Sequence, residues 1–239
     1  MLDLNNVVSG YEKVVVCRNI SINVGEGEFV SIVGANGAGK TTLLKTISGL
    51  LPVSEGTILF NGEDISNMES HKISKRRLVL GAGMESLFAP MTVFDNLMVN
   101  LYTFRHLMSK QEIAEQFEYV FTVFPKLKER KDQKAGTLSG GERQMLSLAK
   151  ALICKPKMLM LDEPSLGLAP IVIDTLFDTI KRVVKEQKLS VLMVEQNVDR
   201  SLEISDRGYV LDVGQIVLEG SAKSLLHDKR VKDVYLGIV

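Results

Sequence analysis

The fold of this chain is decided by one stretch near its start, Phe29-Val30-Ser31-Ile32-Val33-Gly34-Ala35-Asn36-Gly37-Ala38-Gly39-Lys40-Thr41-Thr42. Its first five residues form an apolar run typical of a buried strand, and residues 43–47, which follow it, have the character of a helix. A strand, a glycine-rich loop and a helix are the context that the phosphate-binding pattern G-x-x-x-x-G-K-[ST] requires. The glycines let backbone N–H groups surround an anion, and the helix N-terminus adds the positive end of its dipole. The stretch therefore predicts a nucleoside triphosphate site.

Two side chains of this stretch carry the chemistry. Lys40 is placed to reach the β- and γ-phosphates of a nucleotide, and the Thr41 hydroxyl is placed to ligate Mg²⁺. The alternative interpretation, a glycine-rich turn that caps a buried helix, explains the glycines but neither Lys40 nor Thr41. The residues predicted to bind nucleotide here are Gly34, Ala35, Asn36, Gly37, Ala38, Gly39, Lys40, Thr41 and Thr42.

Length and composition limit the class of protein. The 239 residues fit one large α/β domain, or one domain with an inserted lobe. Because 29 Lys and Arg balance 29 Asp and Glu, no overall basic field indicates a nucleic-acid partner. Cys17 and Cys154 lack metal-ligand spacing, which favours semi-buried thiols in a reducing compartment. With neither a signal-peptide pattern nor an apolar run of about 20 residues, we expect a soluble intracellular protein that contacts a membrane only through a partner.

The order of the predicted elements indicates an α/β fold with an inserted helical lobe. Apolar residues recur at helical spacing over residues 92–121, and Pro125 is expected to end that helical stretch. The charged residues 126–134 are expected to form a solvated loop or face. Later segments alternate strand and helix, as in a mainly parallel sheet. The strands expected at the start of the chain, which include an antiparallel layer, are residues 4–8, 14–16, 20–24 and 28–33.

An acidic pair follows a second buried strand. Met158-Leu159-Met160-Leu161 is typical of a strand buried on both faces of a parallel sheet, and Asp162 and Glu163 come directly after it. Ligands bind at this carboxyl edge of such sheets. Asp162 suits coordination of Mg²⁺, and Glu163 suits polarising a water for attack on the γ-phosphate. An acidic turn before Pro164 is the simpler alternative, and the phosphate-binding loop upstream argues against it.

Leu138-Ser139-Gly140-Gly141-Glu142 has a structural and a functional interpretation. Ser139 and Glu142 form the pattern of a capping box, which satisfies a helix N-terminus. That interpretation does not require two glycines, which weaken the start of a helix. Ser139, Gly140 and Gly141 instead expose backbone donors and predict a second anion site. Two phosphate-binding helix ends suggest a nucleotide shared between two subunits.

Residues 34–41, the motif 138–142 and Leu159-Met160-Leu161-Asp162-Glu163-Pro164, in this order, resemble the nucleotide-binding subunit of an ABC transporter, a P-loop NTPase. The resemblance covers essentially the whole chain and implies a single ABC ATPase domain over residues 1–239. Its core would be a mixed, mainly parallel sheet. The parts implied are an antiparallel β layer with the phosphate-loop core (1–83), an α-helical lobe with the signature motif (84–155), and the rest of the core with the C-terminal tail (156–239).

The same resemblance implies an assembly and further roles. Two ATPase subunits would pack head to tail, with each ATP held between one phosphate loop and the other subunit's Ser139, Gly140 and Gly141. Tyr11 would stack on adenine, and residues 165–168 would communicate across the dimer. Residues 81–91 would receive the coupling helix of a membrane subunit.

Within the family, several segments are similar to the second ATPase subunit of branched-chain amino acid importers, and importers of urea and short amides share much of the pattern. The resemblance implies ATP and Mg²⁺ as cofactors and a position at the cytoplasmic face of the inner membrane. It also implies a second similar ATPase subunit, or a homodimer in isolation, two membrane permease subunits and an external solute-binding protein. The segments are Ser165-Leu166-Gly167-Leu168-Ala169-Pro170, Val194-Glu195-Gln196-Asn197, residues 206–211, residues 214–220 and residues 234–237.

Two positions depart from the wider family. Gln196 stands where most members have a histidine that contacts the γ-phosphate. The branched-chain subfamily also has glutamine at this position, and its amide can still donate a hydrogen bond. A polar cap at the end of a strand is the alternative role for Gln196. Gly83 stands where the family has glutamine or glutamate, and Glu85 lies two positions further on.

These departures leave more than one functional hypothesis. The first is an ATPase that powers import, with Lys40, Glu163 and Gln196 as its catalytic residues. The second is a nucleotide-binding clamp with little hydrolysis of its own, which completes the site of a partner ATPase. The third, an ABC ATPase that acts on DNA or ribosomes, is disfavoured because such proteins fuse two cassettes or insert coiled coils.

Overall fold

The computed structural model describes residues 1–81, 83–104 and 108–236, and it contains two β-sheets. The larger sheet has the strand order β10 (Gln215–Ser221), β9 (Arg207–Asp212), β3 (Phe29–Val33), β8 (Ser190–Glu195), β7 (Met158–Asp162) and β6 (Leu78–Gly81). The smaller sheet has the order β2 (Val14–Val24), β1 (Leu2–Tyr11), β4 (Val53–Phe60) and β5 (Glu63–Asp64).

The larger sheet is mainly parallel. Strand β3 pairs in parallel with β8 and β9, and β7 pairs in parallel with β6 and β8. The pairing of β9 with β10 is antiparallel, which makes the sheet mixed. The smaller sheet is antiparallel throughout its pairings. The predicted fold class, a mixed and mainly parallel core with an antiparallel layer, is confirmed.

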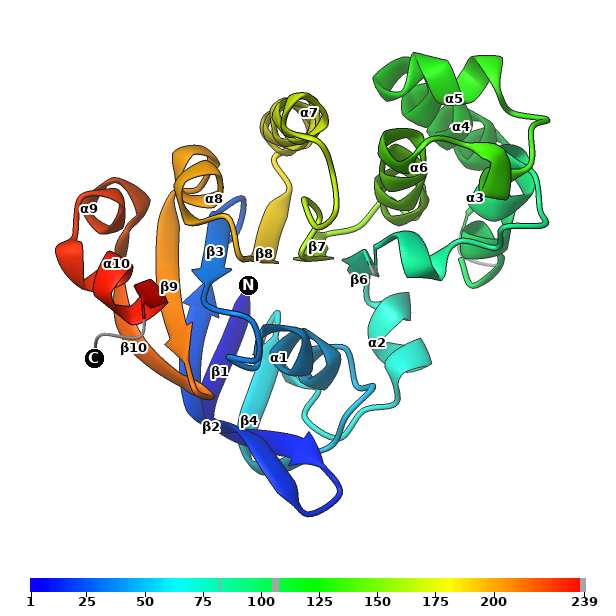
Figure 1. Ribbon diagram of the computed structural model, residues 1–239. Coiled ribbons are helices and arrows are strands. Elements are labelled where there is room, and N and C mark those ends of the chain that lie inside the picture. Colours follow the sequence, from blue (N-terminus) through cyan, green and yellow to red (C-terminus); the bar gives the residue numbers. More distant parts are fainter. Residues whose placement is uncertain (82, 105–107, 237–239) are drawn as a thin grey trace.

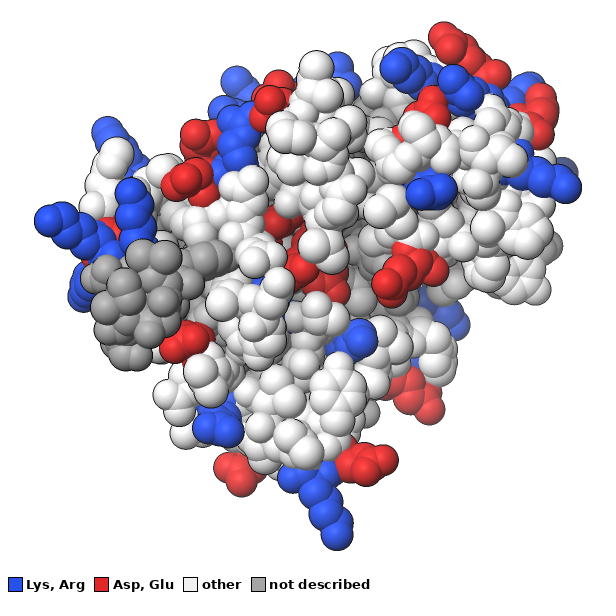
Figure 2. Space-filling model, in the orientation of Figure 1, with Lys and Arg blue, Asp and Glu red and all other residues white. Residues whose placement is uncertain are grey.

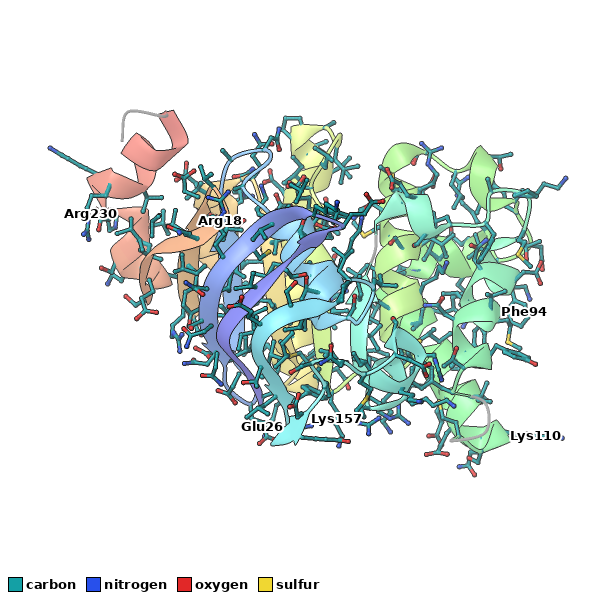
Figure 3. All side chains as sticks on the ribbon, turned by 90° about the horizontal axis from the view of Figure 1, so that it is seen from below. Arg18, Glu26, Phe94, Lys110, Lys157 and Arg230 are labelled. Atoms are coloured by element: carbon teal, nitrogen blue, oxygen red, sulfur yellow. The ribbon has the colours of Figure 1, made fainter. Side chains whose placement is uncertain are left out.

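Helices cover both faces of the larger sheet (Figure 1). Helix α1 (Lys40–Ile47) lies between the two sheets, and Figure 3 shows the antiparallel sheet curving across the near side of the molecule. Helices α7 (Pro170–Gln187) and α8 (Val198–Ile204) lie on the opposite face. Residues of one strand alternate between these faces: Met160 packs in the cluster around α1, whereas Leu161 packs in the cluster with α7. This two-sided burial explains the continuous apolar runs of the parallel strands.

A group of helices stands beside the sheet edge formed by β6, in green in Figure 1. Two of these helices begin with capping boxes that we did not predict from the sequence. One is formed by Thr92 with Asp95 and the other by Ser109 with Glu112. The stretch 92–121 is therefore two helices; residues 105–107 within it, like Ala82 and residues 237–239, lie outside the described residues. The helices of this group are α3 (Val93–Tyr102), α4 (Lys110–Val123), α5 (Pro125–Glu129) and α6 (Gly140–Leu152).

Short elements complete the described chain. Among residues 1–81, 83–104 and 108–236, no helix is long and apolar enough to cross a membrane. The remaining helices are α2 (Ser70–Lys75), α9 (Ala222–Leu226), α10 (Lys229–Leu236) and the 3₁₀ helices η1 (Met84–Ser86) and η2 (Ala135–Thr137).

One local expectation was wrong and two were confirmed. Residues 14–16 and 20–24 belong to one strand, β2, because Asn19 adopts a positive φ of 53° and the strand continues through the irregular register. The break expected at Pro125 is present, because α4 ends at Val123; Pro125 then begins α5, since proline at the first helical position loses no hydrogen bond. The charged stretch 126–134 is mostly exposed, as expected, and its first residues lie in α5.

The two cysteines are more buried than expected. Cys17 and Cys154 are both fully buried and free. Burial raises the pKa of the Cys17 thiol to about 11 and that of the Cys154 thiol to about 12. Both thiols therefore stay protonated at neutral pH and act as small apolar core residues.

Candidate functional site

Lys40 lies at the centre of the site. It is the first residue of α1, directly after the glycine loop that leaves β3, and only 3% of it is exposed. Its ammonium group donates to the carbonyl oxygens of Gly34 (2.7 Å) and Ala35 (2.9 Å). The same Nζ lies 3.0 Å from Oε1 of Glu163. The loop thus holds its own cation at the edge of the sheet and directs it toward an acidic residue from another strand.

Thr41 and Asp162 form the second contact across the site. The Thr41 hydroxyl donates to Oδ1 of Asp162 at 2.9 Å, which joins the start of α1 to the end of β7. Burial is the main cause that raises the pKa of Asp162, and the hydrogen bond from Thr41 opposes it. A hydroxyl and a partly buried carboxylate in contact are the oxygen ligands that Mg²⁺ prefers, so the residues present fit this ion.

Glu163 is held by its backbone as well as by Lys40. Its φ is +41°, and its N–H donates to the carbonyl of Val194 on the neighbouring strand β8 at 2.9 Å. A positive φ at a residue other than glycine or asparagine is uncommon and stores strain, which often accompanies a functional role. The turn directs the Glu163 carboxylate back over the end of the sheet.

A cavity of ≈ 240 Å³ joins these groups. Figure 2 shows acidic side chains recessed near the centre of the face on which Figure 1 places the ends of β7 and β8. The cavity therefore connects the phosphate loop with the acidic pair and with η1. Its lining residues are Thr41, Gly83, Met84, Glu85, Gln144, Asp162, Glu163 and Leu166.

Ser139 starts α6 outside this cavity. Its hydroxyl accepts a hydrogen bond from the Glu142 N–H, and the Glu142 carboxylate accepts from the Ser139 N–H and hydroxyl, so the capping box is formed. The two glycines differ in their surroundings. A Cβ on Gly141 would lie 2.7 Å from Cγ1 of Val172 in α7, whereas a Cβ on Gly140 would meet nothing within 4 Å. The capping box explains Ser139, close packing explains Gly141, and Gly140 remains open for an approaching group.

Tyr11 also lies outside the cavity lining. It ends β1 at the hairpin that leads into β2, and 44% of it is exposed. The following strand passes beneath the phosphate loop, where a Cβ on Gly39 would lie 3.3 Å from Cγ1 of Val16. The hairpin that carries Tyr11 therefore belongs to the surroundings of the loop, with the phenol ring accessible.

Gln196 follows β8, and its neighbour Glu195 was missed by the sequence analysis. Glu195 is 1% exposed, and its carboxylate accepts hydrogen bonds from the backbone N–H groups of Ser165, Gln196 and Asn197. Burial raises the pKa of Glu195, and these hydrogen bonds oppose the shift. A carboxylate directly after the apolar run Val191-Leu192-Met193-Val194 is a signal that could have identified it, because such a group needs donors nearby.

An apolar surface lies on α3 and on the segment between η1 and α3. Asn96, fully buried in α3, binds the backbone of Phe88 through both its amide oxygen and its amide nitrogen. Lys150 of α6 donates to the Ser86 carbonyl and lies over the Phe88 ring at 5.0 Å. We call the following exposed residues the α3 surface: Phe88, Met91, Phe94, Met98, Val99 and Tyr102.

A comparison with known families decides the class of protein. A family model described as ABC transporter matches residues 17–166. The chain belongs to the ABC transporter family. It is an ATPase of the ATP-binding cassette type, as the resemblance in its motifs implied.

Curated relatives match along the full length of this ABC protein. It is 40% identical over 237 residues to the high-affinity branched-chain amino acid transport ATP-binding protein BraG of Pseudomonas aeruginosa, covering 99% of this chain and 100% of BraG. It is 37% identical to the probable branched-chain amino acid transport ATP-binding protein LivF of Archaeoglobus fulgidus, with both chains fully covered. The lipopolysaccharide export ATP-binding protein LptB of Escherichia coli is 33% identical, with 99% and 97% covered.

A solved cassette has the same fold. The ADP conformation of MJ1267, an ATP-binding cassette of an ABC transporter, superposes with a TM-score of 0.85 at 29% identity and covers 99% of this chain and 98% of that one.

Gly83 is the position at which we expect this ABC cassette to depart from the family pattern. Its φ of 61° and ψ of −170° lie in a region that only glycine adopts readily. Its carbonyl accepts from the hydroxyls of Ser86 and Ser147, which fixes the loop to α6. Glu85, two residues on, lines the cavity instead.

Proposed function

We propose that this chain binds and hydrolyses ATP to power an ABC importer of branched-chain amino acids or a related small polar solute. The observation that carries the proposal is the contact of Lys40 with Glu163 beside that of Thr41 with Asp162, at one edge of the parallel sheet. Full-length similarity to BraG and LivF supports the choice of solute class.

The site groups have distinct roles in this proposal. Lys40 exchanges its carboxylate partner for the β- and γ-phosphates when ATP binds, which frees Glu163. Glu163 then accepts a proton from the attacking water, and the Gln196 amide donates to a γ-phosphate oxygen. Thr41 and Asp162 would hold Mg²⁺, which supplies neutralising charge at the phosphate oxygens when bound. Residues 34–42 surround the phosphates with backbone N–H groups.

A second ATPase subunit completes each site. Gly140, open on its Cβ side, together with Ser139 and Gly141 would meet the γ-phosphate of ATP held by that subunit. Tyr11, exposed on its hairpin, would stack on adenine. The partner is a similar ATPase subunit, or a second copy of this chain when it is purified alone.

The remaining partners follow from the α3 surface. Exposed aromatic and methionine side chains on α3 and on the segment that joins it to η1 suit the burial of an apolar helix. We assign this surface to one of two membrane permease subunits, which would hold the chain at the cytoplasmic face of the inner membrane. An external solute-binding protein would act through those subunits.

Uptake into vesicles tests the proposal. The chain would be assembled in proteoliposomes with its second ATPase, permease and solute-binding subunits, and uptake of radiolabelled leucine and of urea would be measured. Leucine uptake that requires ATP and is abolished by Glu163→Gln supports the proposal, and the exposed Glu203→Gln serves as the control. Undiminished uptake with Glu163→Gln would favour the clamp, in which the partner's site alone hydrolyses ATP.

A further inference from the structure

Glu195 is a buried carboxylate that the proposed reaction does not use. It is the last residue of β8, a strand in which all six residues are buried. Burial of an ionised group costs several kcal/mol unless hydrogen bonds replace its water, so a chain keeps such a group only where donors surround it. The donors around Glu195 therefore show which backbone segments its carboxylate holds in place.

Those donors come from two loops. Oε1 of Glu195 accepts from the Ser165 N–H at 2.7 Å, and Oε2 accepts from the N–H groups of Gln196 at 2.9 Å and Asn197 at 3.3 Å. Ser165 lies in the loop that follows β7, two residues after Glu163, and Gln196 begins the loop after β8.

Each loop leads directly into the proposed site. Leu166, next to Ser165, lines the cavity with Asp162 and Glu163, and 60% of it is exposed. On the other side, the Asn197 side chain caps α8 by accepting from the Arg200 N–H. One carboxylate thus fixes the backbone of two loops beside the proposed site, one three residues past the end of β7 and the other directly after β8.

The chemistry of these contacts requires a carboxylate. Its two oxygens accept from several N–H groups at once, and charge-assisted hydrogen bonds are shorter and stronger than neutral ones. Glutamine has the same shape but one oxygen, so its NH₂ group would face a backbone N–H. A substitution by glutamine therefore removes part of the bridge and leaves the packing nearly unchanged.

We propose that Glu195 is a positioning residue that holds Gln196 and the segment 165–168 in one fixed arrangement, so that the γ-phosphate contact and the partner-facing loop are set together. The inference rests on the proposed roles of Gln196 and this segment. Removing the bridge should misplace Gln196 by a fraction of an ångström to about 1 Å, which is enough to slow a positioned reaction by about 10-fold or more.

The test compares ATP hydrolysis by the wild-type chain, Glu195→Gln, Gln196→Ala and the double variant. We expect Glu195→Gln to lower kcat by about 10-fold, with KM for ATP within about 2-fold, and to add less than about 2-fold in the Gln196→Ala background. Glu203→Gln, the same change on an exposed residue of α8, is the control. A wild-type kcat in Glu195→Gln, or a full additive effect in the double variant, would overturn the inference.

Hydrogen–deuterium exchange provides a readout independent of turnover. In Glu195→Gln, the amides of Ser165, Gln196 and Asn197 should exchange faster, while those of residues 34–42 keep their wild-type rates. Equal exchange at the three amides in both proteins would also overturn the inference. If the wild-type chain failed to hydrolyse ATP while its three amides still exchanged more slowly than those of Glu195→Gln, the result would count against the proposed function. The role of Glu195 in holding the two loops would stand.

Discussion

The ammonium of Lys40 lies 3.0 Å from the Glu163 carboxylate while it also donates to two carbonyls of its own loop. The phosphate-binding cation and the proposed base are thus each other's partners. Phosphate oxygens must compete with Glu163 for Lys40, so the pair couples nucleotide binding to release of the base.

Glu163→Gln should therefore bind nucleotide more tightly than the wild type. The glutamine amide competes less well than the carboxylate for Lys40. Because the ion pair that ATP must displace is worth about 1 kcal/mol, its loss should lower the Kd about 5-fold. Calorimetric titration with the non-hydrolysable analogue AMP-PNP and Mg²⁺ measures it, with Glu203→Gln as the control. Lys40→Ala should abolish the binding in the same assay. A Kd for Glu163→Gln that equals or exceeds the wild-type value would contradict the competition.

The two glycines of α6 should respond differently to alanine. Gly141→Ala places a methyl group against Val172, whose β-branched side chain cannot turn away freely, and should lower the free energy of unfolding by about 1–3 kcal/mol. Gly140→Ala should leave stability unchanged or raise it by up to about 1 kcal/mol. Urea unfolding checks both variants. Equal losses of stability would show that Gly140 is also packed.

Gly140→Ala should nevertheless impair the assembled ATPase. Its methyl group would stand where the partner's γ-phosphate approaches, so ATP turnover of the complex should fall although the variant is fully folded. Turnover equal to that of the wild type would remove Gly140 from the shared site.

The fold and the phosphate side of the site were predictable because local patterns encode them. A strand, a glycine loop and a helix place Lys40 and Thr41, and an apolar run followed by two acids places Asp162 and Glu163 at the same sheet edge. Glu195 was not predictable in this way, since one of its donors, Ser165, lies 30 residues earlier in the chain. The continuity of β2 was missed because a positive φ at Asn19 lets a strand pass a position that resembles a turn.

Glu142 should make the stability of α6 depend on pH. Hydrogen bonds from the Ser139 N–H and hydroxyl, with the nearby Arg130, hold the pKa of Glu142 below its ordinary value of 4.5. The folded protein therefore gains stability from Glu142 above that ordinary pKa and loses it as the pH falls through the lowered pKa.

Glu142→Ala should cost about 1 kcal/mol of unfolding free energy near neutral pH, and the deficit should shrink in acid. Urea midpoints of the wild type and the variant at about pH 7 and about pH 4 measure the change, and Glu219→Ala, at an exposed residue of β10, is the control. A deficit that grows as the pH falls would contradict the sign of this argument.

Glu85 should contribute to hydrolysis in place of the glutamine or glutamate side chain that we expect the family to have at the position of Gly83. It lines the cavity with Thr41, Asp162 and Glu163, so Glu85→Ala should lower kcat by about 10-fold with little change in KM for ATP. Steady-state ATPase assays of this variant and of Glu26→Ala, in the exposed turn before β3, make the comparison. Equal kcat values for the two variants would show that Glu85 does not contribute to hydrolysis.

ATP turnover by the complex assembled with catalytically inactive partner ATPase subunits tests whether this chain hydrolyses ATP, because only the sites formed by this chain remain active. We predict turnover by the wild-type chain and a loss of at least about 100-fold in Glu163→Gln, with ATP still bound. Turnover that is unchanged by Glu163→Gln, or absent with the wild-type chain, would contradict it.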